Sequence, residues 1–209
     1  MQLRVDRPVV LGVTGGVASG KSTVVGYFVH RGANSVSADD IARQLLSPGT
    51  EMTMRVIAHF GANFALSGSP VQVDRAKLAA RIFADDRARR ELGEIMHPAI
   101  HKLTEQQVNA ARADNACRLV AVEIPLLYEN RLETTVDRVL VAMCPEAEQV
   151  RRLIGRHPAL TEADALRQIH AQMPINQKAG MADFTIDTDR PEQMVRRDAD
   201  ELYDRLTQS

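Results

Sequence analysis

The chain has 209 residues, a formal net charge of -1, 44% hydrophobic residues and 25% charged residues. These values are typical of a globular protein with a full hydrophobic core, and they exclude a disordered or fibrous chain. The balanced charge lacks the basic excess that nucleic-acid-binding proteins usually carry. We therefore expect a small-molecule substrate, no nucleic acid and no obligate protein partner.

The two cysteines, Cys117 and Cys144, lie far apart and form no C-x-x-C motif. This spacing argues against a zinc site or a disulfide framework and favours a reducing, cytoplasmic setting. The N-terminus carries Arg4, Asp6 and Arg7 in place of an apolar segment, and no apolar run is long enough to cross a bilayer. The sequence therefore predicts no membrane contact.

Residues 12–23, GVTGGVASGKST, fit the G-x-x-x-x-G-K-[ST] pattern of a phosphate-binding loop. An apolar run at 9–13 predicts a buried strand before the loop, and 22–30 can form a helix after it. In such a loop the backbone N–H groups surround nucleotide phosphates, the lysine reaches their terminal oxygens and the hydroxyl holds Mg²⁺. A plain glycine turn, the alternative, needs neither Lys21 nor Ser22. The predicted nucleotide-binding residues are Gly15, Gly16, Val17, Ala18, Ser19, Gly20, Lys21, Ser22 and Thr23, with Ser22 as the metal ligand.

Two acids follow the next predicted strand. The first helix is expected to end near Gly32, and 33–37 predict a short strand that leads into Asp39 and Asp40. Because the carboxyl ends of strands in an open parallel sheet face the ligand crevice, one acid is a candidate base. The alternative is that Asp39 or Asp40 only caps a helix over 41–46.

The chain changes character between residues 48 and 114, where apolar residues recur at helical spacing and no central strand is evident. Residues 71–73 can form a small extended piece beside a turn. His97 and His101 share a helix face, but a metal is not expected, because no third ligand cluster is evident and Pro98 indicates a helix start.

Strand character returns at residues 118–124 and 136–142, and 183–186 predict a last strand before a C-terminal helix. Near-continuous apolar runs of this kind are typical of parallel strands covered on both faces. Glu123 follows four apolar residues and could approach Mg²⁺ through water, like the acid of a Walker-B strand. A purely structural role for Glu123 is an equally open alternative.

A charged helical hairpin is predicted between the last two strands, with one helix over 146–156 and a second helix capped by Thr161. The first helix carries Arg151, Arg152 and Arg156. Guanidinium groups match phosphate oxygens, and phosphoryl transfer needs positive charge on the transferring group. The alternative for each arginine is a place on a solvated face.

In the order of its motifs and predicted elements, the sequence resembles dephospho-coenzyme A kinase from residue 10 to about residue 206. The phosphate-binding loop is shared by many nucleotide-binding proteins, whereas the other shared motifs are much more specific in this order. These motifs are A-D-D-I-A-R at 38–43, F-G at 60–61, D-R at 74–75, H-P-A-I at 97–100, P-L-L-Y-E at 125–129, R-L-I-G-R at 152–156, A-Q at 171–172 and A-D-F-T-I at 182–186.

The resemblance implies an α/β P-loop fold of the nucleoside-monophosphate-kinase type, with three α/β/α layers and a parallel five-stranded sheet. It also implies ATP-dependent phosphorylation of the 3′-hydroxyl of the ribose of dephospho-coenzyme A, with Mg²⁺. The implied organisation is a single kinase domain over 1–209, with a core at 8–47, 115–144 and 181–209, a helical coenzyme-binding insertion at 48–114 and a helical lid at 145–180.

The resemblance further assigns roles to residues. Asp39 would accept or orient the hydroxyl proton, and Lys21 would hold the β and γ phosphates. Arg156 would close over the γ-phosphoryl, with Arg152 as a further nucleotide contact. The implied substrate-binding residues are Asp39, Arg43, His97, Pro125, Leu126, Leu127 and Glu129.

Three positions depart from the family pattern. Ser37 stands where the family usually has an acid, and His157 stands where Asp usually follows the lid arginine. Asp187 and Thr188 occupy the place where the family commonly has an Asn near the adenine. The residues that contact the adenine therefore stay open.

Two rival functions can be tested against the same sequence. Another small-molecule or nucleotide kinase of this fold would differ in the helical insertion, and assays of acceptors would separate the two. A nucleotide-dependent switch would be expected to carry D-x-x-G and N-K-x-D motifs, and neither occurs in the chain.

Overall fold

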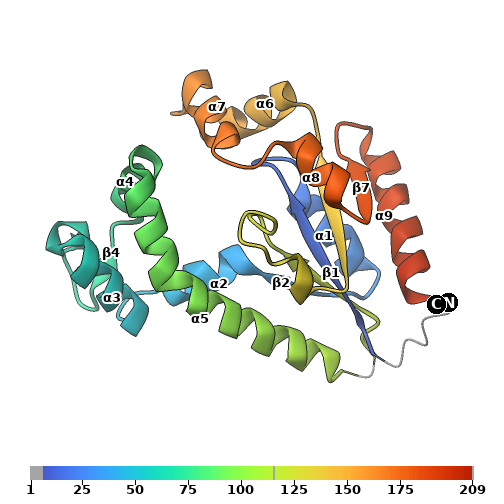
Figure 1. The fold of residues 1–209 in the computed structure, drawn as a ribbon, viewed down its shortest axis with the longest axis horizontal. Coiled ribbons are helices and arrows are strands. Elements are labelled where there is room, and N and C mark those ends of the chain that lie inside the picture. Colours follow the sequence, from blue (N-terminus) through green and yellow to red (C-terminus); the bar gives the residue numbers. More distant parts are fainter. Residues whose placement is uncertain (1–6, 115, 209) are drawn as a thin grey trace. The chain divides into compact units, whose positions relative to one another are not determined.

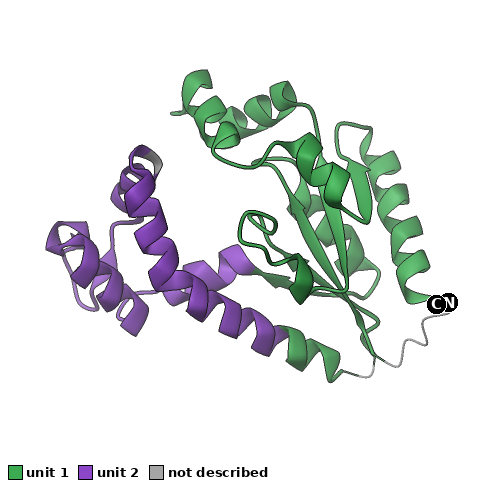
Figure 2. Cartoon of the chain, in the orientation of Figure 1, with its two compact units in different colours: residues 1–37, 108–209 green, residues 38–107 purple. Residues whose placement is uncertain are grey.

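The computed structural model describes residues 7–114 and 116–208, so Arg4 and Asp6 of the polar N-terminus lie outside the described residues. The chain divides into two compact units (Figure 2), which we call unit 1 (1–37 and 108–209) and unit 2 (38–107). None of the helices in the described part has the length and apolar character that a membrane span requires.

Unit 1 is built on a parallel sheet of five strands in the order β2-β5-β1-β6-β7 (Figure 1), which confirms the predicted sheet. The central strands β5, β1 and β6 are mainly apolar and are buried over most of their length, as expected of parallel strands with both faces covered. The strands are β1 Val9–Gly15, β2 Asn34–Ser37, β5 Leu119–Glu123, β6 Arg138–Met143 and β7 Phe184–Asp187.

Helices α1, α8 and α9 of unit 1 contact this sheet, whereas α6 and α7 pack against each other. The main core joins the strands to α1 and α9 through apolar side chains that include Phe28 and Leu202. A smaller cluster, centred on Leu153 and Ala165, joins α6 to α7. Thr161 caps α7 as predicted, and its capping box with Asp164 satisfies N–H groups at the start of the helix. The helices are α1 Lys21–His30, α6 Glu146–Arg156, α7 Glu162–His170, α8 Ile175–Met181 and α9 Glu192–Thr207, with a 3₁₀ turn at Glu133–Thr135.

Unit 2 is helical, and its one pair of described strands is short and antiparallel. The extended piece expected at 71–73 is β4. Apolar side chains from α3, α4 and α5, including Val56, Leu78 and Met96, form its core. The elements are α2 Ala38–Leu45, α3 Glu51–Phe60, a 3₁₀ turn at Ala62–Phe64, β3 Ala65–Leu66, β4 Gln72–Val73, α4 Arg75–Ala84 and α5 Asp86–Arg112, whose last turn belongs to unit 1.

Unit 2 has bounds that differ from those predicted for the helical insertion, 48–114. The second unit begins ten residues earlier, at Ala38, because Ala42 and Leu45 of α2 pack into its core. It ends at Gln107, before the last turn of α5, where Arg112 pairs with Asp137 of unit 1 at 3.1 Å. Residues of the A-D-D-I-A-R motif thus belong to the helical unit.

The structure corrects the prediction for Pro98. This residue does not start a helix; it lies inside α5, which runs from Asp86 to Arg112. Proline in a helix interior loses a backbone hydrogen bond and crowds the preceding turn. Here Met96, Ala99 and Ile100 on both sides of it belong to the core of unit 2, and their burial holds the helix together.

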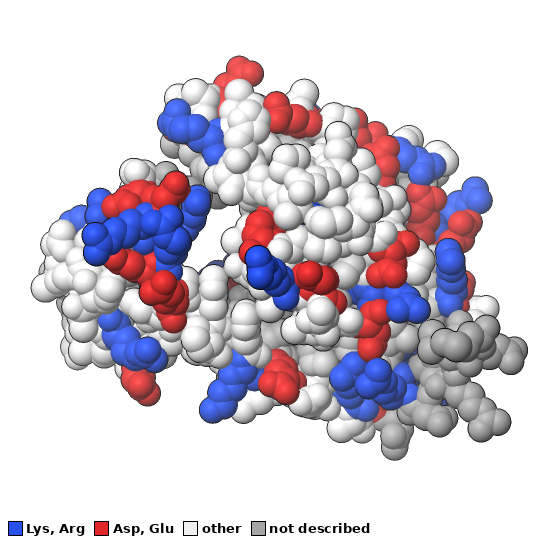
Figure 3. Space-filling model, viewed as in Figure 1, with Lys and Arg blue, Asp and Glu red and all other residues white. Residues whose placement is uncertain are grey.

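Basic and acidic side chains are mixed on the face of the molecule seen in Figure 3. Figure 3 shows Lys and Arg side chains beside Asp and Glu side chains over the viewed face. This pattern agrees with the small net charge of the sequence.

Candidate active site

The phosphate-binding loop connects β1 to α1, as the motif predicts. Gly15 has a φ of 151°, and a Cβ at this residue would lie 2.2 Å from the backbone oxygen of Ala142. A Cβ at Gly16 would lie 2.3 Å from Oε1 of Gln149. Gly15 therefore requires glycine, because the loop backbone passes directly against the backbone of β6, whereas a side chain at residue 16 would displace the buried Gln149 side chain of α6.

Lys21 is the first residue of α1, and its side chain is directed back onto the loop. Its Nζ donates a hydrogen bond to the carbonyl oxygen of Gly16 at 2.8 Å, and Nζ also lies 3.4 Å from that of Gly15. The residue is only 9% exposed. A positive charge is thus held among the backbone groups that surround phosphates in such loops.

Ser22 and Glu123 meet at the adjacent ends of α1 and β5. The Ser22 hydroxyl donates to Oε1 of Glu123 at 2.9 Å. Mg²⁺ prefers oxygen ligands and uses only one or two protein groups when it also binds substrate phosphates. A hydroxyl and a carboxylate side by side fit that requirement. Of the two alternatives for Glu123, this pairing favours the role near a metal.

The loop after β5 is held by a buried lysine. Lys178 of α8 has no exposed surface, and its Nζ donates to the carbonyl oxygen of Pro125 at 2.9 Å and pairs with Glu129 at 2.8 Å. The same carbonyl accepts from Thr14 Oγ1 at 3.1 Å. The Glu129 oxygen also accepts from the backbone N–H of Met173 at 2.9 Å. Lys178 thus connects α8 with the P-L-L-Y-E segment.

These contacts bear on the predicted substrate-binding residues of that segment. Leu127 is fully buried, and its Cδ1 would lie 2.8 Å from a Cβ at Gly12. Its side chain therefore fills the core of unit 1 and offers no exposed surface to a substrate. Pro125 and Leu126 are half-buried, and Glu129 is engaged with Lys178.

Lys178→Met is expected to lower the free energy of unfolding by about 3–5 kcal/mol, because it leaves the Glu129 carboxylate without its buried partner. Urea denaturation followed by circular dichroism measures this loss. Lys102→Met, at an exposed lysine of α5, is the control and should change the unfolding free energy little. A loss below about 1 kcal/mol would show that the buried pair contributes little to stability.

The three arginines of α6 have different surroundings. Arg151 is exposed and pairs with Glu148 at 2.6 Å. Arg152 is partly buried and binds both Glu148 and Thr188. Arg156 is exposed, and nothing in the described part of the chain is hydrogen-bonded or ion-paired to it. Hydrogen bonds from Arg151 and then Arg152 lower the pKa of Glu148 to about 2. The Arg156 guanidinium is therefore the one of the three without a described partner.

The acids of the A-D-D-I-A-R motif also differ. Helix α2 begins at Ala38, so Asp39 and Asp40 both lie in its first turn, and the alternative in which one of them only caps a helix that starts at residue 41 does not hold. The Asp40 carboxylate pairs with Arg43 at 2.7 Å. Asp39 is exposed, and among residues 7–114 and 116–208 its carboxylate has no hydrogen-bond or ion-pair partner.

Unit 2 also contains His97, a predicted substrate-binding residue, and Arg75, which binds the C-terminal end of α2. The rings of His97 and His101 stack with centroids 6.0 Å apart. Burial, and to a smaller extent His101, lowers the pKa of His97, which favours a neutral ring. Arg75 donates to the carbonyl oxygens of Arg43 and Leu46 at 2.8 and 3.0 Å, so it satisfies the end of α2.

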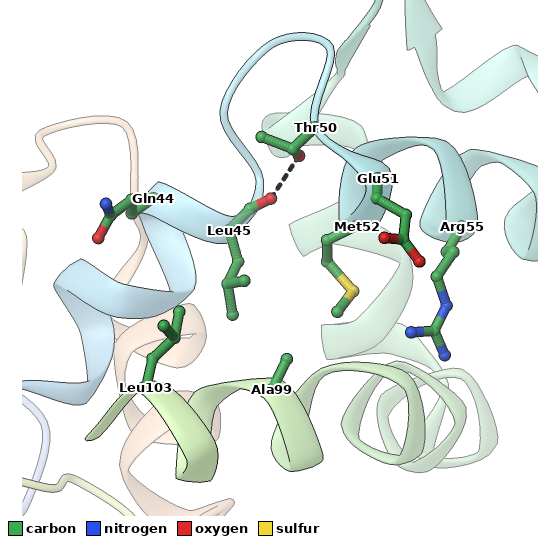
Figure 4. Close-up of a pocket in the computed structure, with 8 residues that line it drawn as sticks. All are labelled: Gln44, Leu45, Thr50, Glu51, Met52, Arg55, Ala99 and Leu103. Atoms are coloured by element: carbon green, nitrogen blue, oxygen red, sulfur yellow. Dashed lines mark hydrogen bonds between the residues drawn. The ribbon is translucent and has the colours of Figure 1, made fainter. Parts of the chain in front are cut away.

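A pocket of about 370 Å³ opens in unit 2 (Figure 4). Apolar side chains of α2, α3 and α5 point into it, and polar ones stand at its side. The Thr50 hydroxyl donates to the carbonyl oxygen of Leu45 at 2.5 Å and holds the connection between α2 and α3. The lining residues are Gln44, Leu45, Thr50, Glu51, Met52, Arg55, Ala99 and Leu103.

Sequence reasoning missed three residues of this arrangement. The D-R motif pointed to Arg75, but nothing local indicated that it binds the end of α2. Lys178 carried no sequence signal, because its partners lie about fifty residues away at Pro125 and Glu129. Thr188 stands out in the sequence only as a departure from the family pattern, and no local pattern indicates its contact with Ser19.

A family model described as dephospho-CoA kinase matches residues 9–193 of the chain. This chain belongs to the dephospho-CoA kinase family. A dephospho-CoA kinase of Shouchella clausii is 38% identical over 199 residues, which are 95% of this chain and 98% of the relative. One of Syntrophotalea carbinolica is 40% identical over 197 residues, 94% of this chain and 92% of the relative.

The fold agrees with this membership. The crystal structure of a Thermus thermophilus protein superposes with a TM-score of 0.78 at 27% identity, covering 97% of this chain and 100% of the other. The resemblance expected from the sequence motifs is thus confirmed. The kinase uses ATP to phosphorylate dephospho-CoA in the final step of coenzyme A biosynthesis.

Proposed function

We propose that the kinase transfers the γ-phosphoryl group of ATP to the 3′-hydroxyl of the ribose of dephospho-CoA, with Asp39 as the group that accepts or orients the hydroxyl proton. The observation that carries this role is the contrast between the two adjacent acids. Asp40 is paired with Arg43, whereas the exposed Asp39 carboxylate has no partner among the described residues. An unpaired carboxylate can act on a substrate proton without first breaking an ion pair.

The nucleotide is proposed to lie in the loop of residues 15–23. The loop amides and Lys21 would bind the β and γ phosphates. Ser22 would hold Mg²⁺, with Glu123 near it, and the ion would neutralise the charge that develops on the phosphates. The hydrogen bond between Ser22 and Glu123 supports this assignment because it brings two suitable oxygen ligands together.

Unit 2 is proposed to bind the coenzyme substrate, with Asp39, Arg43 and His97 among the contacts. Its pocket offers apolar side chains together with Arg55, a combination that suits a ligand with apolar and anionic parts. From the P-L-L-Y-E segment, Pro125 and Leu126 stay proposed contacts. For Glu129 we propose support of that segment through Lys178.

Helices α6 to α8 are proposed to form the lid. Water is far more concentrated than the acceptor, so a kinase that leaves the site open would hydrolyse ATP. Arg156, the arginine without a described partner, is the proposed clamp on the γ-phosphoryl group. We further propose a cytoplasmic enzyme with no nucleic-acid partner, supported by its free cysteines and balanced charge.

Arg156→Ala should lower kcat more than it raises the KM for ATP, because a contact that forms on closure is strongest in the transition state. Arg156→Lys should recover only part of the activity, since it keeps the charge and loses the planar fork. Steady-state kinetics at saturating dephospho-CoA measure both effects.

The control for this prediction is Arg151→Ala. Arg151 lies on the same helix, is exposed and pairs only with Glu148 among the described groups, so its removal should change kcat little. Equal, small effects at the two positions would mean that the phosphate clamp lies elsewhere in the chain.

The proposed transfer is tested by measuring ATP consumption with and without dephospho-CoA and by identifying the phosphorylated position of the product by nuclear magnetic resonance. ATP consumption that depends on dephospho-CoA, with a 3′-phosphate in the product, is the expected result. Consumption unchanged by dephospho-CoA, or a phosphate on another hydroxyl, would contradict the proposal.

A further inference from the structure

Thr188, the residue directly after β7, lies against the phosphate-binding loop. It is 8% exposed. Its hydroxyl donates to the carbonyl oxygen of Ser19 at 2.8 Å, and its backbone N–H donates to Met143 at 2.8 Å. A Cβ at Gly20 would lie 3.0 Å from Thr188. The end of the last strand is therefore packed onto the turn that precedes Lys21.

Arg152 holds Thr188 from the other side. Its Nη1 donates to the Thr188 hydroxyl at 3.0 Å and its Nη2 to the Thr188 carbonyl at 2.7 Å. Its Nε donates to Glu148 at 2.6 Å. Glu148, like any glutamate without a raised pKa, is charged at neutral pH, and its bonds to Arg151 and Arg152 lower its pKa further, to about 2. The Arg152 guanidinium is thus oriented by its bond to Glu148, and its two terminal nitrogens both donate to Thr188.

These contacts control the direction of a loop N–H group. In a trans peptide, the C=O of one residue and the N–H of the next point in opposite directions. Fixing the Ser19 carbonyl toward Thr188 therefore directs the Gly20 N–H away from Thr188. In a phosphate-binding loop these N–H groups bind the nucleotide phosphates, so a rotated Ser19–Gly20 peptide would remove one donor.

We propose that Arg152 and Thr188 are positioning residues that orient the phosphate-binding loop through the Ser19 carbonyl. This assignment rests on the proposed role of the loop in binding ATP. It gives Arg152 a different function from the expected direct contact with the nucleotide. Thr188 stands at a position where the family commonly has Asn, and the proposal gives it the role of holding the Ser19 carbonyl.

The test compares two substitutions at Thr188, one that removes the hydroxyl group and one that keeps it. Thr188→Val keeps the volume and removes the hydroxyl, and it should raise the Kd for ATP by about tenfold, the typical cost of a lost donor in a buried contact. Thr188→Ser keeps the hydroxyl and should bind ATP within about twofold of the parent. Thr185→Val, at an exposed threonine of β7, is the control. ATP titration without dephospho-CoA, together with thermal melting, separates binding from folding.

A double-variant cycle distinguishes positioning from direct contact by Arg152. If Arg152 acts through Thr188, then adding Arg152→Met to Thr188→Val should change the Kd for ATP by less than about twofold. If Arg152 binds the nucleotide itself, the effects of the two substitutions multiply, and the proposal fails. If Thr188→Val does not fold, the ATP titration is carried out on Arg152→Met alone. An unchanged Kd for ATP in that variant would overturn the proposal.

An unchanged Kd in folded Thr188→Val, or an equal weakening in Thr188→Ser, would also overturn the positioning role. Failure of the proposed function gives a different result. In that case Lys21→Ala would retain turnover, whatever the substitutions at Thr188 do.

Discussion

Lys21→Ala should lower kcat by at least about 10²–10³-fold, the usual effect of removing one donor that stabilises developing charge. The Lys21 ammonium donates to the carbonyl oxygen of Gly16 at 2.8 Å, within the phosphate-binding loop, so its loss removes positive charge from the proposed phosphate site. The apolar core of unit 1 is formed by other residues and should stay intact. A coupled assay for ADP release measures the loss, and circular dichroism checks the fold.

The matched control for this variant is Lys102→Ala, which removes an exposed lysine of α5 and should leave turnover near that of the parent. Lys21→Met adds a second comparison, because it retains most of the side-chain volume without the charge and should be as inactive as the alanine variant. Near-normal turnover in either Lys21 variant would show that the loop does not bind the transferred phosphate.

Asp39→Asn should lower kcat by at least about a hundredfold, since a positioned base typically contributes 10²–10⁴-fold. The substitution preserves the shape of the side chain and removes its basic oxygen. Binding of ATP should persist, because the substitution leaves the loop amides and Lys21, the proposed phosphate ligands, unchanged. Rapid-quench measurement of phosphoryl transfer, with a separate ATP titration, tests the two statements.

Asp40→Asn is the control for Asp39→Asn. Its carboxylate already pairs with Arg43 at 2.7 Å, so the change should cost little activity. The reverse order, with Asp40→Asn inactive and Asp39→Asn active, would place the base one residue later in the chain.

Features that depend on neighbouring residues could be predicted from the sequence. The phosphate-binding loop is one continuous motif, because its glycines, lysine and serine act within a single turn of chain. The three central strands, β5, β1 and β6, follow from apolar runs, and the cap of α7 follows from Thr161 and Asp164. In the same way, the order of short motifs sufficed to indicate the kinase family, which the comparisons confirm.

Local patterns were misleading where tertiary contacts override them. Pro98 is a helix-start signal by itself, yet burial of Met96 and Ala99 keeps it inside α5. Asp39 and Asp40 resemble capping residues, yet α2 starts directly after β2, before either acid. Which of the two carries an ion pair depends on the turn of α2 that presents Asp40 to Arg43.

By itself, the sequence determined the strands, the phosphate-binding loop and the family, because each depends on residues close together in the chain. Only the tertiary structure decided which distant residues meet. Ser22 bonds to Glu123 across 101 positions, and Thr188 bonds to Ser19 across 169. These pairs form because the sheet order places β5 beside β1 and positions the end of β7 near the loop. Hydrogen bonds act over about 3 Å, so spacing along the chain does not reveal them.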